Sequence, residues 1–419
     1  MKYASFVLTW ILVAVLLLSA VGCNGEIQSS DLMNGIRPQG GNGKNSDEAF
    51  LNHQWALSLE LFSQSVQKSK KNNVLISPLS IQLALTMTAN GAKGNTLSEM
   101  ESVLGGTIPL TDLNAYLKSY SKNLPQGEKY KLNIANSIWF RDEEDRLTVE
   151  QDFLQKNADC FGAQIYKSAF DNQTLKDINL WVSENTDGMI DKILDEIHPD
   201  AVMYLINALV FDAEWEKVYD KSSVRDGAFT DINGVRQNAT MMHSEESIYL
   251  EDGRATGFVK QYKNRKYSFA VLLPNTNVDL YDYINGLTAE ELQNTLNNRQ
   301  TTTVFATMPK FSYQYELSMN TVLAELGMPT AFSPQNADFS ALGKSTRGNL
   351  YISNVLHKTF ISVDELGTKA GAVTMVEMRD EAAPMDPKTV VLDRPFIFMI
   401  LDNTTNLPVF IGVLTSLPQ

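Results

Sequence analysis

Apolar residues recur along this chain with two different periods. The first clear helical spacing predicts an amphipathic helix on Leu51, Trp55, Leu59, Phe62 and Val66. Further helices are predicted over Leu79–Asn90, Leu147–Phe161, Leu175–Leu194 and Asn320–Gly327. Strands are predicted over Tyr204–Phe211, Tyr267–Leu273, Thr302–Met308, Asn349–Leu356, Phe396–Ile400 and Pro408–Leu414. Helices fall mostly in the first half of the chain and strands in the second, so the pattern predicts an α+β fold.

The first 22 residues are typical of an export signal. Lys2 precedes an apolar run over 6–21, and small residues at 20–22 are followed at once by Cys23. This order predicts a lipoprotein-type signal peptide that is removed, with Cys23 lipidated as the new N-terminus. Ordinary secretion stays the alternative, because Ala20 stands where lipoprotein signals usually have Leu. We therefore expect a cell-surface or outer-membrane lipoprotein, or a secreted, extracellular protein.

Residues 23–45 are rich in Gly, Asn, Ser and Gln and contain few apolar residues. Such a segment buries too little surface to offset its loss of conformational entropy, which predicts a flexible tether. After residue 45 no internal repeat, low-complexity block or domain boundary interrupts the chain. We therefore predict one large domain over residues 46–419.

Charge and motif content narrow the possible functions. The formal net charge is −14, which argues against binding to nucleic acid or heparin, because both need clustered Lys and Arg. The four histidines show no metal-binding spacing, and no nucleophile elbow or phosphate-binding loop occurs. The sequence thus disfavours an enzyme and implies neither a metal nor an organic cofactor.

Blocks of sequence along most of the chain carry a family resemblance. NVLISPLSIQLALTMTANGAKGNTLSEM (Asn73–Met100) strongly resembles the first signature of the serpin family. Further similar blocks follow in the family's order at Ile178–Ile190, Leu205–Trp215, Phe229–Ser244, Met308–Met328, Ala337–Leu342, Val355–Thr374 and Asp393–Gly412. The resemblance covers everything after the predicted tether, about 370 residues.

This resemblance implies both a fold and a mechanism. The fold is a metastable α+β domain, with helices around a five-stranded central sheet, further sheets and an exposed reactive-centre loop. The mechanism is that of a monomeric suicide inhibitor of serine proteases: the protease cuts the loop, forms an acyl-enzyme, and is trapped when the loop inserts as a new strand. A non-inhibitory serpin acting as a binding protein stays open as an alternative, as does an unrelated surface hydrolase.

The resemblance places the hinge of the reactive-centre loop at Glu365, Gly367, Thr368, Ala370, Gly371 and Ala372. The residues themselves suit insertion, because side chains alternate faces in a strand. From Thr368 to Met378 every even-numbered residue is uncharged, and no Pro occurs before Pro384. Segment 368–378 could therefore become a buried strand.

The cleaved bond has several candidates. The usual family spacing from Glu365 points to the bond after Glu381, whereas spacing back from Pro395 points to Met385. Cleavage after Ala382 or Ala383 would suit an elastase-like protease, after Met385 an elastase- or chymotrypsin-like one, and after Glu381 a glutamyl-specific one.

The resemblance also assigns a buried polar cluster under the sheet, formed by Ser77, Ser80, Asn207 and His357. Hydroxyls, an amide and an imidazole can donate hydrogen bonds to one another and accept them, so such a cluster can hold two strands together. Trp215 matches the family's tryptophan beneath the point where the loop inserts. Plain core packing is the alternative for Trp215.

Overall fold

The computed structural model describes residues 25–69, 72–368 and 386–418. Its helices are α2 (Glu48–Ser69), α3 (Pro78–Ala89), α4 (Gly94–Gly105), α5 (Leu110–Asn123), α6 (Gln151–Phe161), α7 (Asn172–Asn185), α8 (Leu280–Asn285), α9 (Ala289–Asn297) and α10 (Asn320–Glu325). Short 3-10 helices lie at Lys221–Ser223, Lys263–Arg265 and Pro329–Phe332. Among these described residues, no helix is both long enough and apolar enough to cross a membrane.

Strands form two large sheets and one small ribbon. The central sheet has the order β1 (Ser30–Asp31), β5 (Gln164–Ser168), β3 (Tyr130–Arg141), β6 (Met203–Glu214), β15 (Gly367–Thr368), β14 (Asn354–Val363) and β12 (Phe311–Ser318). The second sheet has the order β16 (Lys388–Val391), β11 (Gln300–Pro309), β8 (Arg236–Glu251), β9 (Ala255–Gln261), β10 (Tyr267–Pro274), β17 (Phe396–Asp402), β18 (Pro408–Leu414) and β2 (Val74–Ile76), with β7 (Val224–Thr230) beside β8. The ribbon joins β4 (Leu147–Val149) and β13 (Gly343–Ser345). The expected five strands of the central sheet are present, and the two-residue strands β1 and β15 are additions to them.

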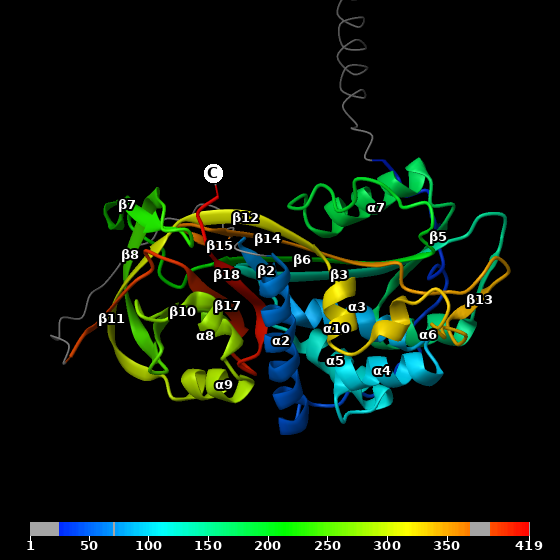
Figure 1. Cartoon of the computed structure of the whole chain (residues 1–419), viewed down its shortest axis with the longest axis horizontal. Helices are drawn as coiled ribbons and strands as arrows, with labels where there is room; N and C mark the ends of the chain where they lie inside the picture. The colour runs from blue at the N-terminus through cyan, green and yellow to red at the C-terminus, as the bar shows by residue number, and fades with distance from the viewer. Residues whose placement is uncertain (1–24, 70–71, 369–385, 419) are drawn as a thin grey trace, which may run out of the picture.

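The central sheet is covered on both faces. Figure 1 shows α7 on one face and α3, α5 and α6 on the other. The strands β8, β10 and β11 of the second sheet lie at the other end of the molecule from α6 and α7. Every residue of α3 is buried, and its start is fixed by Ser77, whose side chain caps the helix ahead of Pro78. Because both faces of β6 are covered, almost all of its residues are apolar and buried.

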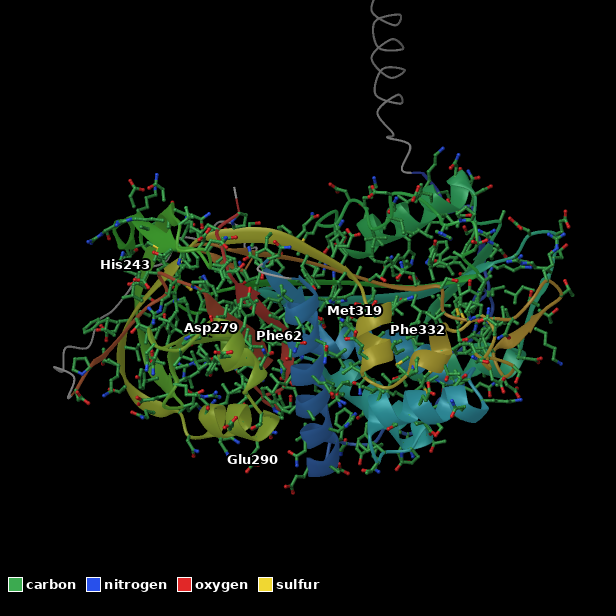
Figure 2. The ribbon with its side chains drawn as sticks, in the orientation of Figure 1. Phe62, His243, Asp279, Glu290, Met319 and Phe332 are labelled. Atoms are coloured by element: carbon green, nitrogen blue, oxygen red, sulfur yellow. The ribbon has the colours of Figure 1, made fainter. Side chains whose placement is uncertain are left out.

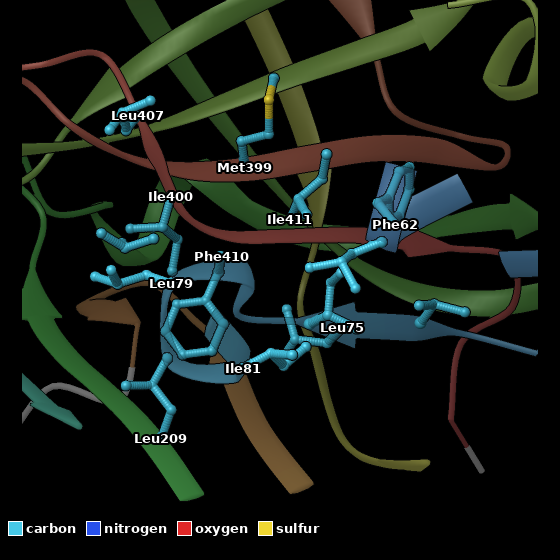
Figure 3. Packing of buried hydrophobic residues seen from close by; sticks show 14 of the residues in the cluster. Phe62, Leu75, Leu79, Ile81, Leu209, Met399, Ile400, Leu407, Phe410 and Ile411 are labelled. Carbon is cyan, nitrogen blue, oxygen red and sulfur yellow. The ribbon is translucent and has the colours of Figure 1, made fainter. Parts of the chain in front are cut away.

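The main hydrophobic core lies where α3 meets the two large sheets. Figure 3 shows Leu79 and Ile81 of α3 facing Phe410 of β18 and Leu209 of β6. Full burial of one such side chain stabilises the folded state by about 1.5–3 kcal/mol. Because these side chains come from α3 and from both sheets, their burial holds the two sheets against the helix.

Several predicted boundaries are wrong for local reasons. The helix predicted to run to residue 194 ends at Asn185, because Asp187 and Gly188 adopt positive φ angles that no helix allows. The helix predicted from Leu147 begins only at Gln151, and residues 147–149 form β4 instead. The strand predicted over 349–356 begins at Asn354.

The composition of residues 23–45 predicts a flexible tether, but residues 28–32 of this segment dock on the central sheet and α7. Strand β1 pairs with β5 at the edge of the central sheet. Asp177 of α7, itself 1% exposed, accepts hydrogen bonds from the backbone N–H groups of Gln28 and Ser29 and from the Ser29 hydroxyl, at 3.1, 2.7 and 2.6 Å. Backbone hydrogen bonds to a sheet edge need no apolar periodicity, so the sequence pattern gives no sign of this docking.

Asp177→Asn should loosen the N-terminal segment, because all three hydrogen bonds end on one carboxylate oxygen and a neutral amide oxygen is a weaker acceptor there. Hydrogen bonds to a charged acceptor are worth about 1.5–3 kcal/mol, so we expect the free energy of unfolding to fall by about that amount in total. Amide exchange at residues 28–32 should accelerate. In a chain shortened to begin at residue 34 the substitution should have little effect, and an equal loss there would contradict this role for Asp177.

Candidate functional site: the seam of the central sheet and the hinge

Strands β6 and β14 meet in a seam that closes only part of their length. They pair directly and in parallel over six residues each, Tyr204–Leu209 with Asn354–Thr359. Beyond this stretch β15 lies between them, with Thr368 opposite both Ala213 of β6 and Val363 of β14. The first two residues of an additional strand therefore already occupy the end of the seam.

Residues just before β15 rest on a platform formed by Trp215 and Tyr219. The backbone N–H of Trp215 donates to the carbonyl of Leu366 at 2.9 Å, and its indole N–H donates to the carbonyl of Asp364 at 2.8 Å. The backbone N–H of Tyr219 donates to the carbonyl of Glu365 at 2.9 Å. Trp215 thus lies directly under the segment that leads into β15.

Glu365 also forms an ion pair with Lys310, which follows β11. The hydrogen bond from Lys310 holds the pKa of the Glu365 carboxyl below its ordinary value. Both side chains are about one-third exposed, so the pair orients the start of the hinge more than it stabilises the fold.

The hinge residues that follow are buried. Thr368 is 1% exposed, and its hydroxyl forms a 2.5 Å hydrogen bond with the hydroxyl of Tyr262. The ring of Tyr262 stacks on Trp215, with centroids 4.4 Å apart. Burial raises the pKa of Tyr262, so the phenol stays neutral. Gly367 lies in β15 without a positive φ angle, so this state does not use the special backbone freedom of glycine.

The structure brings Ser77, Ser80, Asn207 and His357 together in the seam. His357 and Asn207 are direct partners in the β6–β14 ladder. The His357 Nε2 accepts the backbone N–H of Ser77 at 3.2 Å, so its Nδ1 carries the proton and donates to the Asn207 side-chain oxygen. The Asn207 amide nitrogen in turn donates to the hydroxyl of Ser80.

Asn136 of β3 is a fifth member of this cluster that sequence reasoning missed. Its side-chain oxygen accepts from the Asn207 amide nitrogen at 2.5 Å, and the two residues are partners in the β3–β6 ladder. The available signal was an asparagine in the middle of an otherwise strand-like run. Tyr262 and Lys310 were missed as well, since nothing in their local sequence indicates contact with the hinge.

Other candidate residues are placed apart or lie outside the described residues. Ala370, Gly371, Ala372, Glu381, Ala382, Ala383, Met385 and Cys23 lie outside them. His243, labelled in Figure 2, lies on β8 far along the chain from the buried His357, and its Nδ1 contacts the hydroxyl of Thr307. Within the described ranges, no group of three or more His, Cys, Asp or Glu side chains is placed to hold a metal ion.

A family model for serpins, described as serine protease inhibitors, matches residues 52–417. The chain belongs to the serpin family. Human serpin B8 is 30% identical over 370 residues, covering 86% of this chain and 97% of its own. Serpins are protease inhibitors rather than enzymes, so the alternative of an unrelated surface hydrolase is wrong.

Solved serpin structures agree with the fold. The native state of tengpin, a thermophilic serpin, is 53% identical and superposes with a TM-score of 0.90, covering 93% of this chain and all of tengpin. The latent state of tengpin superposes less closely, with a TM-score of 0.80. Human thyroxine-binding globulin, complexed with its hormone, is 24% identical with a TM-score of 0.79, covering 88% of this chain and 98% of its own; that likeness shows the fold alone.

Protonation of His357 should weaken this serpin. Burial lowers the pKa of His357 to about 3, because a second proton would turn Nε2 into a donor facing the Ser77 N–H. The unfolded chain takes up that proton near pH 6.5, so stability falls as the pH drops below about 6.5, by at most about 1.4 kcal/mol per pH unit.

His357→Gln keeps one donor and one acceptor but cannot be protonated. Its free energy of unfolding should therefore depend less on pH between 7 and 5 than that of the wild type, as measured by denaturant titration at each pH. The pKa of His53 is also lowered by burial. Because His53 is present in both proteins, its contribution to the pH dependence cancels when the two slopes are compared. Equal slopes would contradict the assignment of His357 as a buried neutral imidazole.

Proposed function

We propose that this serpin inhibits its target protease as a suicide substrate, by covalent trapping and insertion of the cleaved loop between β6 and β14. The observation that carries the proposal is the position of β15. Thr368 pairs with both strands and Gly367 with β6, and the direct β6–β14 pairing lies further along the same two strands. A longer β15 would extend along this seam without any change in strand order.

Insertion would exchange one hydrogen-bonded ladder for two. The β6–β14 pairing is parallel, whereas β15 is antiparallel to both neighbours. Antiparallel ladders are slightly more stable per residue than parallel ones, and each new hydrogen bond contributes about 0.5–1.5 kcal/mol net. The uncharged even-numbered residues between 368 and 378 supply side chains that can be buried on one face.

The proposed target is a serine protease of elastase-like or chymotrypsin-like specificity. The candidate residues for cleavage are Ala382, Ala383 and Met385, with Glu381 suiting a glutamyl-specific enzyme. The inhibitor is proposed to act as a monomer. Insertion and hydrolysis of the acyl-enzyme compete, so the ratio of complex to cleaved serpin measures the rate of insertion relative to the rate of hydrolysis.

Incubation with pancreatic elastase or chymotrypsin should give a covalent band of summed mass on a denaturing gel. Thr368→Arg places a charge in a position that is 1% exposed, which costs several kcal/mol unless the charge is paired. This variant should still fold, because the two-residue strand β15 can leave the seam. Insertion of the loop would have to bury the charge again, so we expect at least tenfold less complex. The cleaved wild type should melt at a higher temperature than the intact protein, and the cleaved variant should not show this gain.

Thr389→Arg is the matched control, because Thr389 lies in β16, just after the loop, and is exposed. It should form complex like the wild type. A wild type that is nicked without forming complex would instead be a non-inhibitory serpin, and undiminished complex from Thr368→Arg would contradict loop insertion.

We also propose that the protein is exported and anchored to a membrane through lipidated Cys23. The signal-like residues 1–22 and the small residues before Cys23 support this proposal. Cys23→Ala should move the protein from the membrane fraction to the soluble fraction of cells, without a change in inhibition. Serine at the same position should behave alike, since neither residue offers a thiol. A variant that stays in the membrane fraction would contradict the anchor.

A further inference from the structure

A lysine lies buried beside the platform that carries the hinge. Lys260 of β9 is 2% exposed, and its ammonium forms a 2.7 Å ion pair with Glu246 of β8, whose side chain is 11% exposed. Lysine is almost never fully buried unless it is paired. A buried ion pair is also poor evidence for stability, because desolvation of both charges offsets their attraction. Its presence here calls for a different explanation.

The ammonium of Lys260 lies against both rings of the platform. It is 4.3 Å from the ring centroid of Tyr219 and 5.5 Å from that of Trp215. A desolvated cation over an aromatic ring is attracted to it and fixes the position of the ring. Burial alone would lower the pKa of Lys260, but Tyr219 and Glu246 outweigh it and hold the pKa above its ordinary value, so the cation persists.

Glu246 completes the network from the other side. Its carboxylate accepts a 2.7 Å hydrogen bond from the hydroxyl of Ser244, which also lies 3.3 Å from the hydroxyl of Tyr219. The two charges, the serine and the tyrosine therefore form one connected group. This group ends at Trp215 and Tyr219, whose backbone and indole N–H groups hold the carbonyls of residues 364–366.

Resting on the proposed inhibitory function, we infer that Lys260 and Glu246 are positioning residues for loop insertion. They fix Trp215 and Tyr219, and these hold the hinge so that Gly367 and Thr368 lie in register opposite Glu214 and Ala213. A hinge held in register lets the next loop residues pair at once. A loosened platform delays insertion and leaves the acyl-enzyme more time to hydrolyse.

The test compares three variants in the same protease reaction. Lys260→Met removes the cation but leaves Glu246 buried and unpaired. The double variant K260M/E246M removes both charges, so it avoids an unpaired buried charge and should fold, but it still lacks the cation beneath the rings. Arg265→Met is the matched control, because Arg265 pairs with Glu216, next to Trp215, in an exposed ion pair whose side chains are 71% and 31% exposed.

The readouts are the rate of loop cleavage, taken as complex plus nicked serpin, and the ratio of complex to nicked serpin. For K260M/E246M we expect an unchanged cleavage rate and at least a threefold lower ratio, with the melting temperature of the cleaved form unchanged. Arg265→Met should match the wild type in both readouts. Should K260M/E246M fail to fold, K260Q/E246Q replaces it, since two amides keep the hydrogen bond without the charges.

A wild-type ratio in the double variant would overturn the inference, because the pair would then only balance charge. An equally low ratio in Arg265→Met would overturn it too, since the effect would not depend on the buried cation. If the wild type itself forms no complex, the proposed function fails and the inference falls with it. If the wild type and the double variant both form complex equally, only the inference fails.

Discussion

The seam between β6 and β14 contains one buried polar contact on which its closure depends, that between His357 and Asn207. These residues face each other on the two strands that an inserting loop has to separate. Their side chains are satisfied only by one another and by groups on α3 and β3. A partly satisfied buried network is costly, so any movement of β14 away from β6 must either keep these bonds or replace them all together.

The two ends of the seam are held by different kinds of interaction. At the end near His357, directional polar groups link β3, β6, β14 and α3 in a fully connected cluster. At the end near Thr368, the contacts are aromatic and electrostatic, with Trp215 at their centre. Backbone N–H groups of Trp215 and Tyr219 also donate hydrogen bonds to the residues just before β15. The end near His357 therefore resists sliding of β6 past β14. At the end near Thr368, one backbone hydrogen-bond partner can be exchanged for the next. In the proposed mechanism, this difference favours insertion that starts at Thr368 and proceeds toward His357.

Sequence patterns predicted the fold class, whereas Ser77, Ser80, Asn207 and His357 were assigned as a cluster only through the resemblance to serpins. The apolar run of β6 and the capped start of α3 at Ser77 are visible in the sequence. Asn136, Tyr262 and Lys260 were missed for a common reason. Each one matters through a partner more than ten residues away, and a single sequence contains no information on which distant residues meet. The docking of residues 28–32 was missed because backbone pairing leaves no compositional signal.

The docked N-terminal segment changes how far the body of the protein can move from a membrane. A flexible tether of 22 residues would have a root-mean-square length of about 25 Å. With Gly25 lying against α7, near Leu180, only Asn24 stands between it and Cys23, which is a reach of about 7 Å over two Cα–Cα steps. An inhibitor anchored there would be confined to a thin layer at the bilayer surface. It would encounter proteases that arrive at that surface sooner than those that diffuse freely above it.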